Sequence, residues 1–219
     1  MDMANRYINS GNDINKVLIV CSENMTNLVD YSDRSTCVLF GDGAGAVVVE
    51  RSANEVSSVL KTNGKHANLI YSKINRVSNY FTEEAELKKH FDEFCSDFFV
   101  IDRKEHMFMD GRKVYCLAIE SMVEVLQQVC KNANLKPADL KFLVPHQANA
   151  RIIDRVVQKL SIPSDKVYVN IENIGNISSA CIPVCLAQLC EQNKLQVGDK
   201  VGLVSFGAGL IYGALIFTV

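Results

Sequence analysis

Two polar side chains carry the clearest chemical signal in the sequence. His146 directly follows the apolar run from Phe142 to Val144 and precedes a helical pattern, which predicts that it lies at a strand end facing a crevice. Asn176 follows Gly175 in a similar turn, about one strand–helix–strand unit later, so both side chains are predicted at the same edge of a sheet. A neutral imidazole and a carboxamide placed together can donate hydrogen bonds to one developing oxyanion. Taken alone, His146 could equally be a structural histidine at a strand end.

Hydrophobic periodicity predicts the elements that must position these residues. Helices are predicted at residues 1–10, 110–132, 152–160 and 178–193. The 110–132 helix is predicted to be largely buried, because it carries a broad apolar stripe. The stripe consists of Val114, Leu117, Ala118, Met122, Val125, Leu126 and Val129. Strands are predicted at 16–22, 36–40, 46–49, 56–61, 142–144 and 167–170, and two more flank residues 206–209. The strand at 16–22 is apolar from Val17 to Cys21 and is predicted to be buried.

The segment from about residue 60 to 105 is the least regular part of the chain. A helix is predicted at 82–98, with Thr82 as its N-cap and apolar residues at helical spacing along one face. The pattern is typical of an amphipathic surface helix. A lid or the wall of a pocket is the alternative interpretation.

A run of glycines at Gly41, Gly43 and Gly45 follows the predicted strand at 36–40. It fits neither the dinucleotide fingerprint nor the Walker pattern, and it opens into a strand rather than a helix. We therefore predict that these glycines let strands and a neighbouring backbone approach closely. Residues 39–44 also resemble residues 205–210, which indicates a duplicated α/β unit.

The composition is that of a globular protein able to bury a sizeable core. The chain has 219 residues, 48% of them hydrophobic, and a formal net charge of −2. It contains no long basic block, which argues against nucleic acid or an anionic membrane as a partner. Residues 201–219 carry no charge, but their glycines favour two buried strands joined by a tight loop over a membrane span.

The 8 cysteines show no Cys-x-x-Cys pair, and no secretory leader precedes them, so we predict reduced thiols and a cytoplasmic protein. Cys181 and Cys185 could face one metal ion from a helix. No further ligand lies near them in the sequence, so core packing is the preferred interpretation and no metal site is predicted.

Five ordered motifs together identify a resemblance. They are Asp33 to Ala46, Met109 to Tyr115, Val144 to Arg151, Asn173 to Pro183, and Ser205 to Gly213. With these motifs the chain resembles β-ketoacyl-[acyl carrier protein] synthase III, of the thiolase superfamily, over nearly its whole length apart from roughly residues 60–105.

The resemblance implies an α/β fold of the thiolase type, with duplicated α-β-α-β-α layers and usually a homodimer. Residues 1–105 would form an incomplete first half, with an irregular or helical insertion near 60–105, and residues 106–219 would form a complete second half. It also implies a decarboxylating Claisen condensation. In the family a cysteine takes an acyl group from acyl-CoA, and malonyl-ACP then loses carbon dioxide to give an enolate that attacks the thioester.

The resemblance also implies roles for individual residues. His146 and Asn176 match the family's enolate-stabilising pair, and the backbone of Ala208 matches an oxyanion position. Asn149 matches a pantetheine-contacting position, with an N-cap as the alternative. Arg151 matches a basic position for docking of the carrier protein or the CoA phosphate, with an exposed helix-terminal arginine as the alternative. Phe206 is a further candidate for substrate binding.

No metal or cofactor is implied by the resemblance. Thioesters of CoA and of acyl carrier protein would be the substrates, and the acyl carrier protein would be the partner.

Three departures from the family pattern qualify this expectation. The family's nucleophilic cysteine lies just upstream of the helix that opens this chain, and none of the 8 cysteines replaces it. Ala208 stands where the family has glycine, which keeps the N–H but restricts φ. Ile177 replaces the usual threonine.

Two function hypotheses follow from these departures. The chain is either part of an acyltransferase in fatty-acid or related biosynthesis, or a non-catalytic truncated homologue that binds acyl carrier protein or pairs with a complete paralogue. In both cases we expect exposed apolar surface and association.

Overall fold

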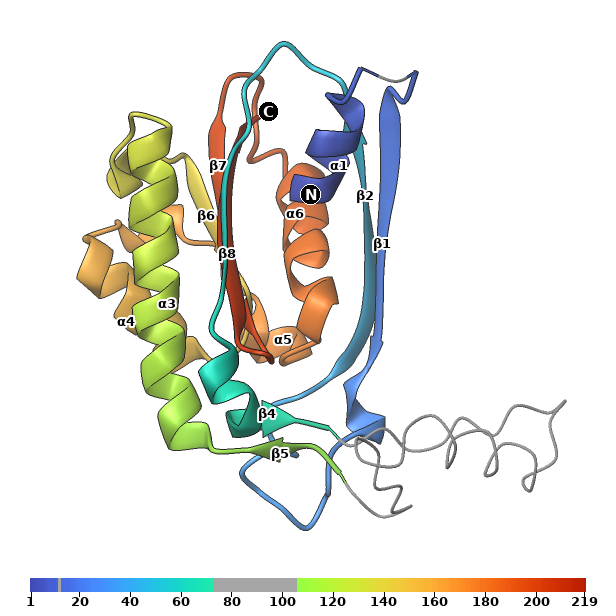
Figure 1. Cartoon of the computed structure of the whole chain (residues 1–219), viewed down its shortest axis with the longest axis vertical. Helices are drawn as coiled ribbons and strands as arrows, with labels where there is room; N and C mark the ends of the chain where they lie inside the picture. The colour runs from blue at the N-terminus through green and yellow to red at the C-terminus, as the bar shows by residue number, and fades with distance from the viewer. Residues whose placement is uncertain (12, 73–105) are drawn as a thin grey trace, which may run out of the picture.

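The computed structural model describes residues 1–11, 13–72 and 106–219 (Figure 1). The predicted helix at 82–98 and its N-cap Thr82 lie outside the described residues, and so does Cys95. The helices are α1 (Asp2–Ile8), α3 (Gly111–Asn132), α4 (Ala150–Leu160), α5 (Ile171–Ile174) and α6 (Cys181–Glu191). The strands are β1 (Lys16–Asn24), β2 (Asp42–Glu50), β3 (Ser57–Thr62), β4 (Ile70–Tyr71), β5 (Phe108–Met109), β6 (Phe142–Pro145), β7 (Lys200–Gly207) and β8 (Ile211–Thr218).

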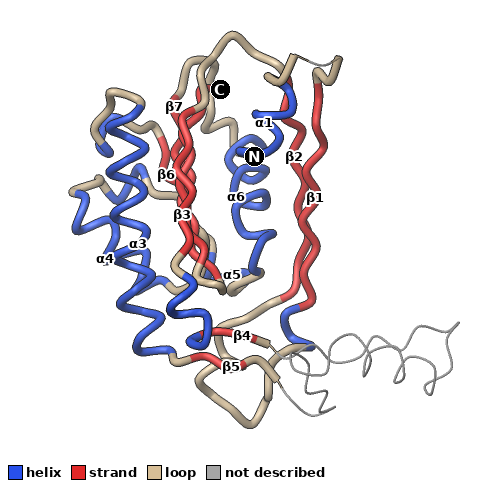
Figure 2. The backbone as a smooth tube through the Cα atoms, viewed as in Figure 1, coloured by secondary structure: helices blue, strands red, loops and turns tan. Residues whose placement is uncertain are grey.

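Helices and sheets alternate in layers across the molecule. The larger sheet is 4-stranded in the order β3-β8-β7-β6, with β6 parallel to β7 and the other pairs antiparallel. Helices α3 and α4 cover one face of this sheet, and α6 lies on the other (Figure 1). The antiparallel pair β1–β2 covers the far side of α1 and α6, so these helices lie between two layers of strands (Figure 2). The mixed α/β fold confirms the predicted fold class.

The main core forms between α3, α4 and the larger sheet. The buried residues of α3 are Val114, Ala118, Ile119, Met122, Val125, Leu126, Val129 and Cys130. This stripe confirms the prediction except that Leu117 is half-buried and that Ile119 and Cys130 extend it. Asp110 caps α3 by accepting a hydrogen bond from the backbone N–H of Lys113 at 3.1 Å, which satisfies one of the free donors of the first turn.

Strand β1 was predicted to be buried, and this prediction is wrong for one of its faces. Exposed and half-buried residues alternate along β1 and β2. Leu18, Val20 and Val48 are 64%, 65% and 63% exposed, because the face of β1–β2 turned away from α6 has no layer over it in the described structure. The exposed apolar surface expected from the sequence is therefore present here. Tyr7 of α1 is also exposed, at 55%.

The predicted strand at 36–40 is wrong. These residues form turns, and only Phe40 makes a single bridge, to Asn176. The Asp33 side chain accepts hydrogen bonds from the backbone N–H of Ser35 at 2.8 Å and from the Thr36 hydroxyl at 3.2 Å. Such local bonds compete with a strand ladder, because they offer the backbone a turn instead. Gly41 directly precedes β2, and Gly43 and Gly45 lie within it, so the resemblance between residues 39–44 and 205–210 does not extend to a common strand–loop–strand structure.

The predicted strand at 167–170 is reduced to a single parallel bridge between Leu143 and Val167. Four other predictions are close to the structure, namely those for the strands at 56–61 and 142–144 and for the two strands around residues 206–209.

No helix among the described residues is long and apolar enough to cross a membrane. Strand β3 lies before residue 105 in the chain but pairs with β8, so the larger sheet draws on both predicted halves.

Candidate functional site

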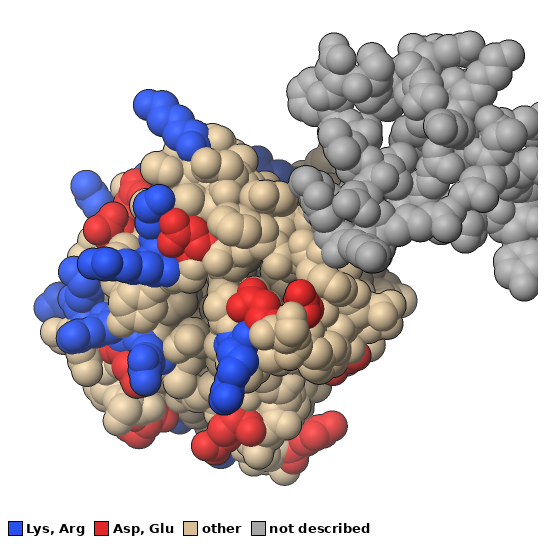
Figure 3. Space-filling model, turned by 90° about the horizontal axis from the view of Figure 1, so that it is seen from below, with Lys and Arg blue, Asp and Glu red and all other residues tan. Residues whose placement is uncertain are grey.

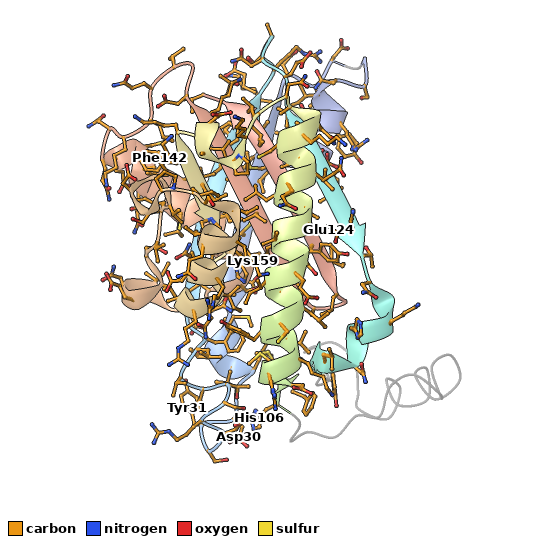
Figure 4. All side chains as sticks on the ribbon, turned by 90° about the vertical axis from the view of Figure 1, so that its left-hand side faces the viewer. Asp30, Tyr31, His106, Glu124, Phe142 and Lys159 are labelled. Carbon is orange, nitrogen blue, oxygen red and sulfur yellow. The ribbon has the colours of Figure 1, made fainter. Side chains whose placement is uncertain are left out.

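His146 and Asn176 line one cavity of about 630 Å³. The cavity lies at the end of β6 that leads into His146, and residues of β4 and β5, which are at the bottom of Figure 1, also line it. Figure 4 shows Phe142, the first residue of β6, in the upper part of the molecule, and Tyr31, which lies in the chain between the cavity residues Leu28 and Ser35, near the bottom. Strand β6 therefore runs toward the site. The prediction that the two side chains come together is confirmed, since both line this cavity, but Asn176 lies in the turn between α5 and α6 rather than at the end of a strand.

The His146 imidazole is held neutral by burial. Its backbone N–H donates to the carbonyl of Val204 at 2.8 Å, which continues the pairing of β6 with β7 past the end of the strand. The side chain is 9% exposed, and desolvation lowers the pKa of the imidazole to about 4. Among the described residues none forms a hydrogen bond with the ring. A neutral imidazole with an uncommitted N–H can donate to an oxygen in the cavity.

The Asn176 side chain is oriented by its neighbours. Its Oδ1 accepts a hydrogen bond from the backbone N–H of Ser178 at 2.9 Å, and the Cys181 Sγ lies 3.9 Å from the same oxygen. Because the oxygen is engaged, Nδ2 is the part of the carboxamide left to donate. Asn176 is 7% exposed, so this donor works in a site largely shielded from water.

The backbone of Asn176 is clamped by the segment that precedes β2. Its N–H donates to Leu39 O at 2.8 Å, and its carbonyl accepts from Gly41 N at 3.0 Å. A Cβ at Gly41 would lie 2.5 Å from Ile174 O, and Gly175 has φ +67°. Gly41 is needed because a side chain would not fit there, and Gly175 is needed because its backbone conformation favours glycine. The prediction that the glycine run permits close approach is confirmed at Gly41.

Phe206, near the end of β7, and Ala208, in the turn between β7 and β8, line the same cavity. Phe206 is 6% exposed and belongs to the main core. Ala208 is not one of the described non-glycine residues with positive φ, so alanine fits this turn without backbone strain. No described residue accepts a hydrogen bond from the Ala208 N–H. That donor is therefore available to the cavity.

Asn149 and Arg151 lie at the start of α4. Asn149 lines the cavity, and it is also the N-cap, since its Oδ1 accepts from the Arg151 N–H at 2.9 Å. Arg151 is exposed and is not part of the cavity lining. Figure 3 views the molecule from the end that holds the site, and Lys and Arg side chains gather on the side where α3 and α4 lie. Exposed Arg112, Lys113 and Arg155 belong to those two helices.

None of the described cysteines lines the cavity. Burial raises the pKa of Cys130 to about 11 and that of Cys185 to about 12, and it also raises the pKa of Cys181. These thiols are poor nucleophiles, because the thiolate is the reactive form. Cys181 and Cys185 are 0% exposed, in agreement with core packing. No group of three or more described His, Cys, Asp or Glu side chains could hold a metal ion.

Several cavity residues were not among the predicted site residues. They are mostly apolar and include Met25, Leu28, Phe40, Tyr71, Met109 and Tyr115. Met109 and Tyr115 belong to a motif that carried the resemblance, so the sequence held a signal for them. Met25 and Leu28 lie in a segment of polar composition with no periodicity, and only the folded chain brings them to the site.

The layers and the site together define the class of protein. Solved structures of 3-oxoacyl-[acyl-carrier-protein] synthase III superpose on the whole chain, which assigns it the thiolase-like fold of condensing enzymes. The structure from Aquifex aeolicus has a TM-score of 0.83 and 34% sequence identity, and the match covers 100% of this chain and 62% of that chain. The structure from Thermus thermophilus has a TM-score of 0.81 at 33% identity, covering 100% and 63%.

The sequence comparisons agree with this class. The family model for 3-oxoacyl-[acyl-carrier-protein] synthase III matches residues 1–65, and the model for its C-terminal part matches residues 130–219. The β-ketoacyl-[acyl-carrier-protein] synthase III of Clostridium tetani is 37% identical over 216 residues. The chain belongs to the 3-oxoacyl-[acyl-carrier-protein] synthase III family. It spans 62% of the length of that relative, while 98% of this chain is matched.

Proposed function

We propose that the chain carries the enolate-forming half of a decarboxylating Claisen condensation, as part of a complete acyltransferase. The observation that supports this most is the pairing of His146 and Asn176 in one cavity, both buried and both with a donor uncommitted to the described protein. Such a pair is suited to an oxyanion, since preorganised donors stabilise charge as it develops.

The proposed step acts on a malonyl thioester. The bond between the carboxylate carbon and the α-carbon breaks, and carbon dioxide leaves. The electron pair of that bond forms the carbon–carbon double bond of an enolate, and the negative charge moves to the thioester oxygen. His146 and Asn176 donate hydrogen bonds to this oxygen. The imidazole stays neutral throughout, because burial holds its pKa near 4.

The condensation is completed when the α-carbon of the enolate attacks an acyl thioester and the sulfur leaves as a thiolate. The N–H of Ala208 is proposed to bind the oxygen of that second thioester. No described cysteine lines the cavity, so the acyl group must be presented by a thiol other than these. Without an acyl thioester to attack, the enolate takes up a proton and gives an acetyl thioester.

The proposed substrates are acyl-CoA and malonyl-acyl carrier protein, used without a further cofactor. Asn149, which lines the cavity, is proposed to contact the pantetheine arm, and Phe206, which also lines it, is proposed to contact the substrate. Arg151, exposed at the start of α4, is proposed to dock the carrier protein or the CoA phosphate outside the cavity. A homodimer and a cytoplasmic location are part of the same proposal.

Decarboxylation of malonyl-CoA by the purified chain tests this function. His146→Ala and Asn176→Ala are each expected to lower the rate of acetyl-CoA formation by about two to three powers of ten, because each removes one oxyanion donor. Lys159→Ala, at an exposed position of α4 outside the cavity, is the control and should retain the rate. Equal rates for the chain and for both site variants would show that the assigned roles are wrong.

A non-catalytic homologue is the second candidate, favoured by the absence of a cysteine among the described cavity residues. In this case the chain binds acyl carrier protein or pairs with a complete paralogue. Incubation with acyl-CoA followed by mass spectrometry separates the two functions. Stable acylation of a cysteine in the chain would contradict the non-catalytic function.

A further inference from the structure

Gln147 is a buried polar side chain with no role in the function proposed above. It is 0% exposed and follows His146 directly. The other buried polar residues described are Thr36, His146, Asn170 and Asn176. Two of these form the site, and Asn170 is bonded to Gln147. A buried carboxamide is retained only when its hydrogen bonds are made, so its partners indicate what it does.

The carboxamide of Gln147 joins two segments of the chain. Its Nε2 donates to Pro145 O at 2.8 Å and to Tyr168 O at 3.3 Å. Its Oε1 accepts from the backbone N–H of Asn170 at 3.0 Å. Both amide hydrogens and the oxygen are therefore engaged, two of these bonds with the segment that leads into α5 and on to Asn176.

The register of the neighbouring backbone explains why the carbonyl of Tyr168 and the N–H of Asn170 need a hydrogen-bond partner. Leu143 bridges Val167 in parallel, and its carbonyl accepts from Tyr168 N at 2.9 Å. In a parallel ladder every second residue repeats the pattern. Residue 145 would therefore donate to the carbonyl of Tyr168 and accept from the N–H of Asn170.

Residue 145 cannot make the first of these bonds, because it is proline and has no N–H to donate. The Gln147 carboxamide bonds to the same two groups, the carbonyl of Tyr168 and the N–H of Asn170. A side-chain carboxamide presents an N–H and a carbonyl like those of a peptide unit. Gln147 thus takes the place of the missing backbone rung between β6 and residues 168–170.

Asn170, which bonds to the Gln147 carboxamide, is itself bonded to two side chains of α6. Asn170 Nδ2 donates to Gln188 Oε1 at 2.8 Å, and Cys185 Sγ donates to Asn170 Oδ1 at 3.3 Å. Helix α6 begins just after the turn that holds Asn176. One chain of buried hydrogen bonds therefore runs from the residue beside His146 to the element beside Asn176.

We infer that Gln147 is a positioning residue, whose carboxamide replaces the rung that Pro145 cannot make and thereby sets His146 against Asn176. The inference rests on the proposed function for its catalytic consequence. Its structural content, the substitute rung, does not depend on turnover. A shift of about 1 Å between two oxyanion donors is enough to cost about a hundredfold in rate.

Gln147→Leu removes all three hydrogen bonds while keeping a similar volume. We expect amide exchange at Asn170 to accelerate at least about tenfold, and the His146 ring resonances to shift. We also expect kcat for malonyl-CoA decarboxylation to fall about ten- to a hundredfold, with KM within about twofold. Gln192→Leu, which removes only the outer bond to the Tyr168 hydroxyl, is the matched control and should leave all four quantities unchanged.

A second variant tests the rung itself. Pro145→Ala in the Gln147→Leu background restores an N–H that can donate to Tyr168 O. The double variant should recover Asn170 protection and part of kcat, whereas Pro145→Ala alone should gain nothing. A double variant no better than Gln147→Leu would overturn the rung, and unchanged His146 resonances and kcat in Gln147→Leu would overturn the positioning role. Failure of the unsubstituted chain to decarboxylate would overturn the proposed function alone, because amide exchange and ring resonances still decide the inference.

Discussion

His146 is neutral at physiological pH because burial lowers its pKa to about 4, and no described residue forms a hydrogen bond with its ring. The same burial that suits it to donate a hydrogen bond makes its protonation unfavourable. The residue therefore links the chemistry of the site to the stability of the fold.

Acid should destabilise the chain through His146. The folded pKa lies below the unfolded value, so the unfolded state binds the proton first, and stability is lost as pH falls from about 6.5 toward 4. The loss from this residue is at most about 3 kcal/mol. Urea unfolding at pH 7 and pH 4.5 should show a smaller difference for His146→Gln than for the unsubstituted chain. His106→Gln, at an exposed position, should show the original difference.

At the scale of elements, the site is built where irregular segments touch, and Gly41 is central to this. Its missing side chain lets residues 39–41 pair with Asn176. Regular elements supply the frame, since β6 delivers His146 and α6 supports the turn after Asn176. The irregular pairing sets the final distance between the two donors.

Gly41→Ala should separate these segments. The added Cβ would lie 2.5 Å from Ile174 O, a backbone atom that cannot turn aside. We expect a loss of about 1–3 kcal/mol in unfolding free energy and a lower decarboxylation rate. Gly64→Ala is the control, because nothing lies within 4 Å of its Cβ position. An unfolding free energy for Gly41→Ala equal to that of the control would contradict the close approach.

The sequence predicted the strongly periodic helices and most strands, and it failed at two short strands. The stripe of α3 and the strand that delivers His146 follow directly from hydrophobic spacing. The strands predicted at 36–40 and 167–170 have apolar residues, but local hydrogen bonds of Asp33 and the missing N–H of Pro145 prevent ladders there. The pairing of His146 with Asn176 was predictable from their spacing. The contribution of Met25 and Leu28 was not, because it depends on tertiary placement.

At the scale of the whole molecule, one face of the β1–β2 pair exposes apolar side chains to solvent. Leu18, Val20 and Val48 form an apolar patch on it, and β1 pairs only with β2 among the described strands. An apolar face beside a free strand edge favours association.

Charge placed on this face should reduce association. Val20→Lys, or Leu18→Lys, is expected to shift the chain toward monomer in sedimentation velocity at a fixed concentration. Association would bury the patch, and burying it would then require the desolvation of a charge. Ser22→Lys adds the same charge at an exposed position of the same face without removing an apolar group, and it should have a smaller effect. Identical sedimentation for all of these variants would show that the patch does not mediate contact.

The clamp on Asn176 also has a kinetic consequence. Leu39 and Gly41 must meet a residue that lies far later in the chain, and His146 is fixed only when β7 pairs with β6. Contacts between distant parts of a chain form late in folding. Helices such as α3 need no such meeting and form early. During refolding, the circular dichroism signal of the helices should therefore return before decarboxylation activity does. The oxyanion site is expected to be among the last parts of the molecule to form.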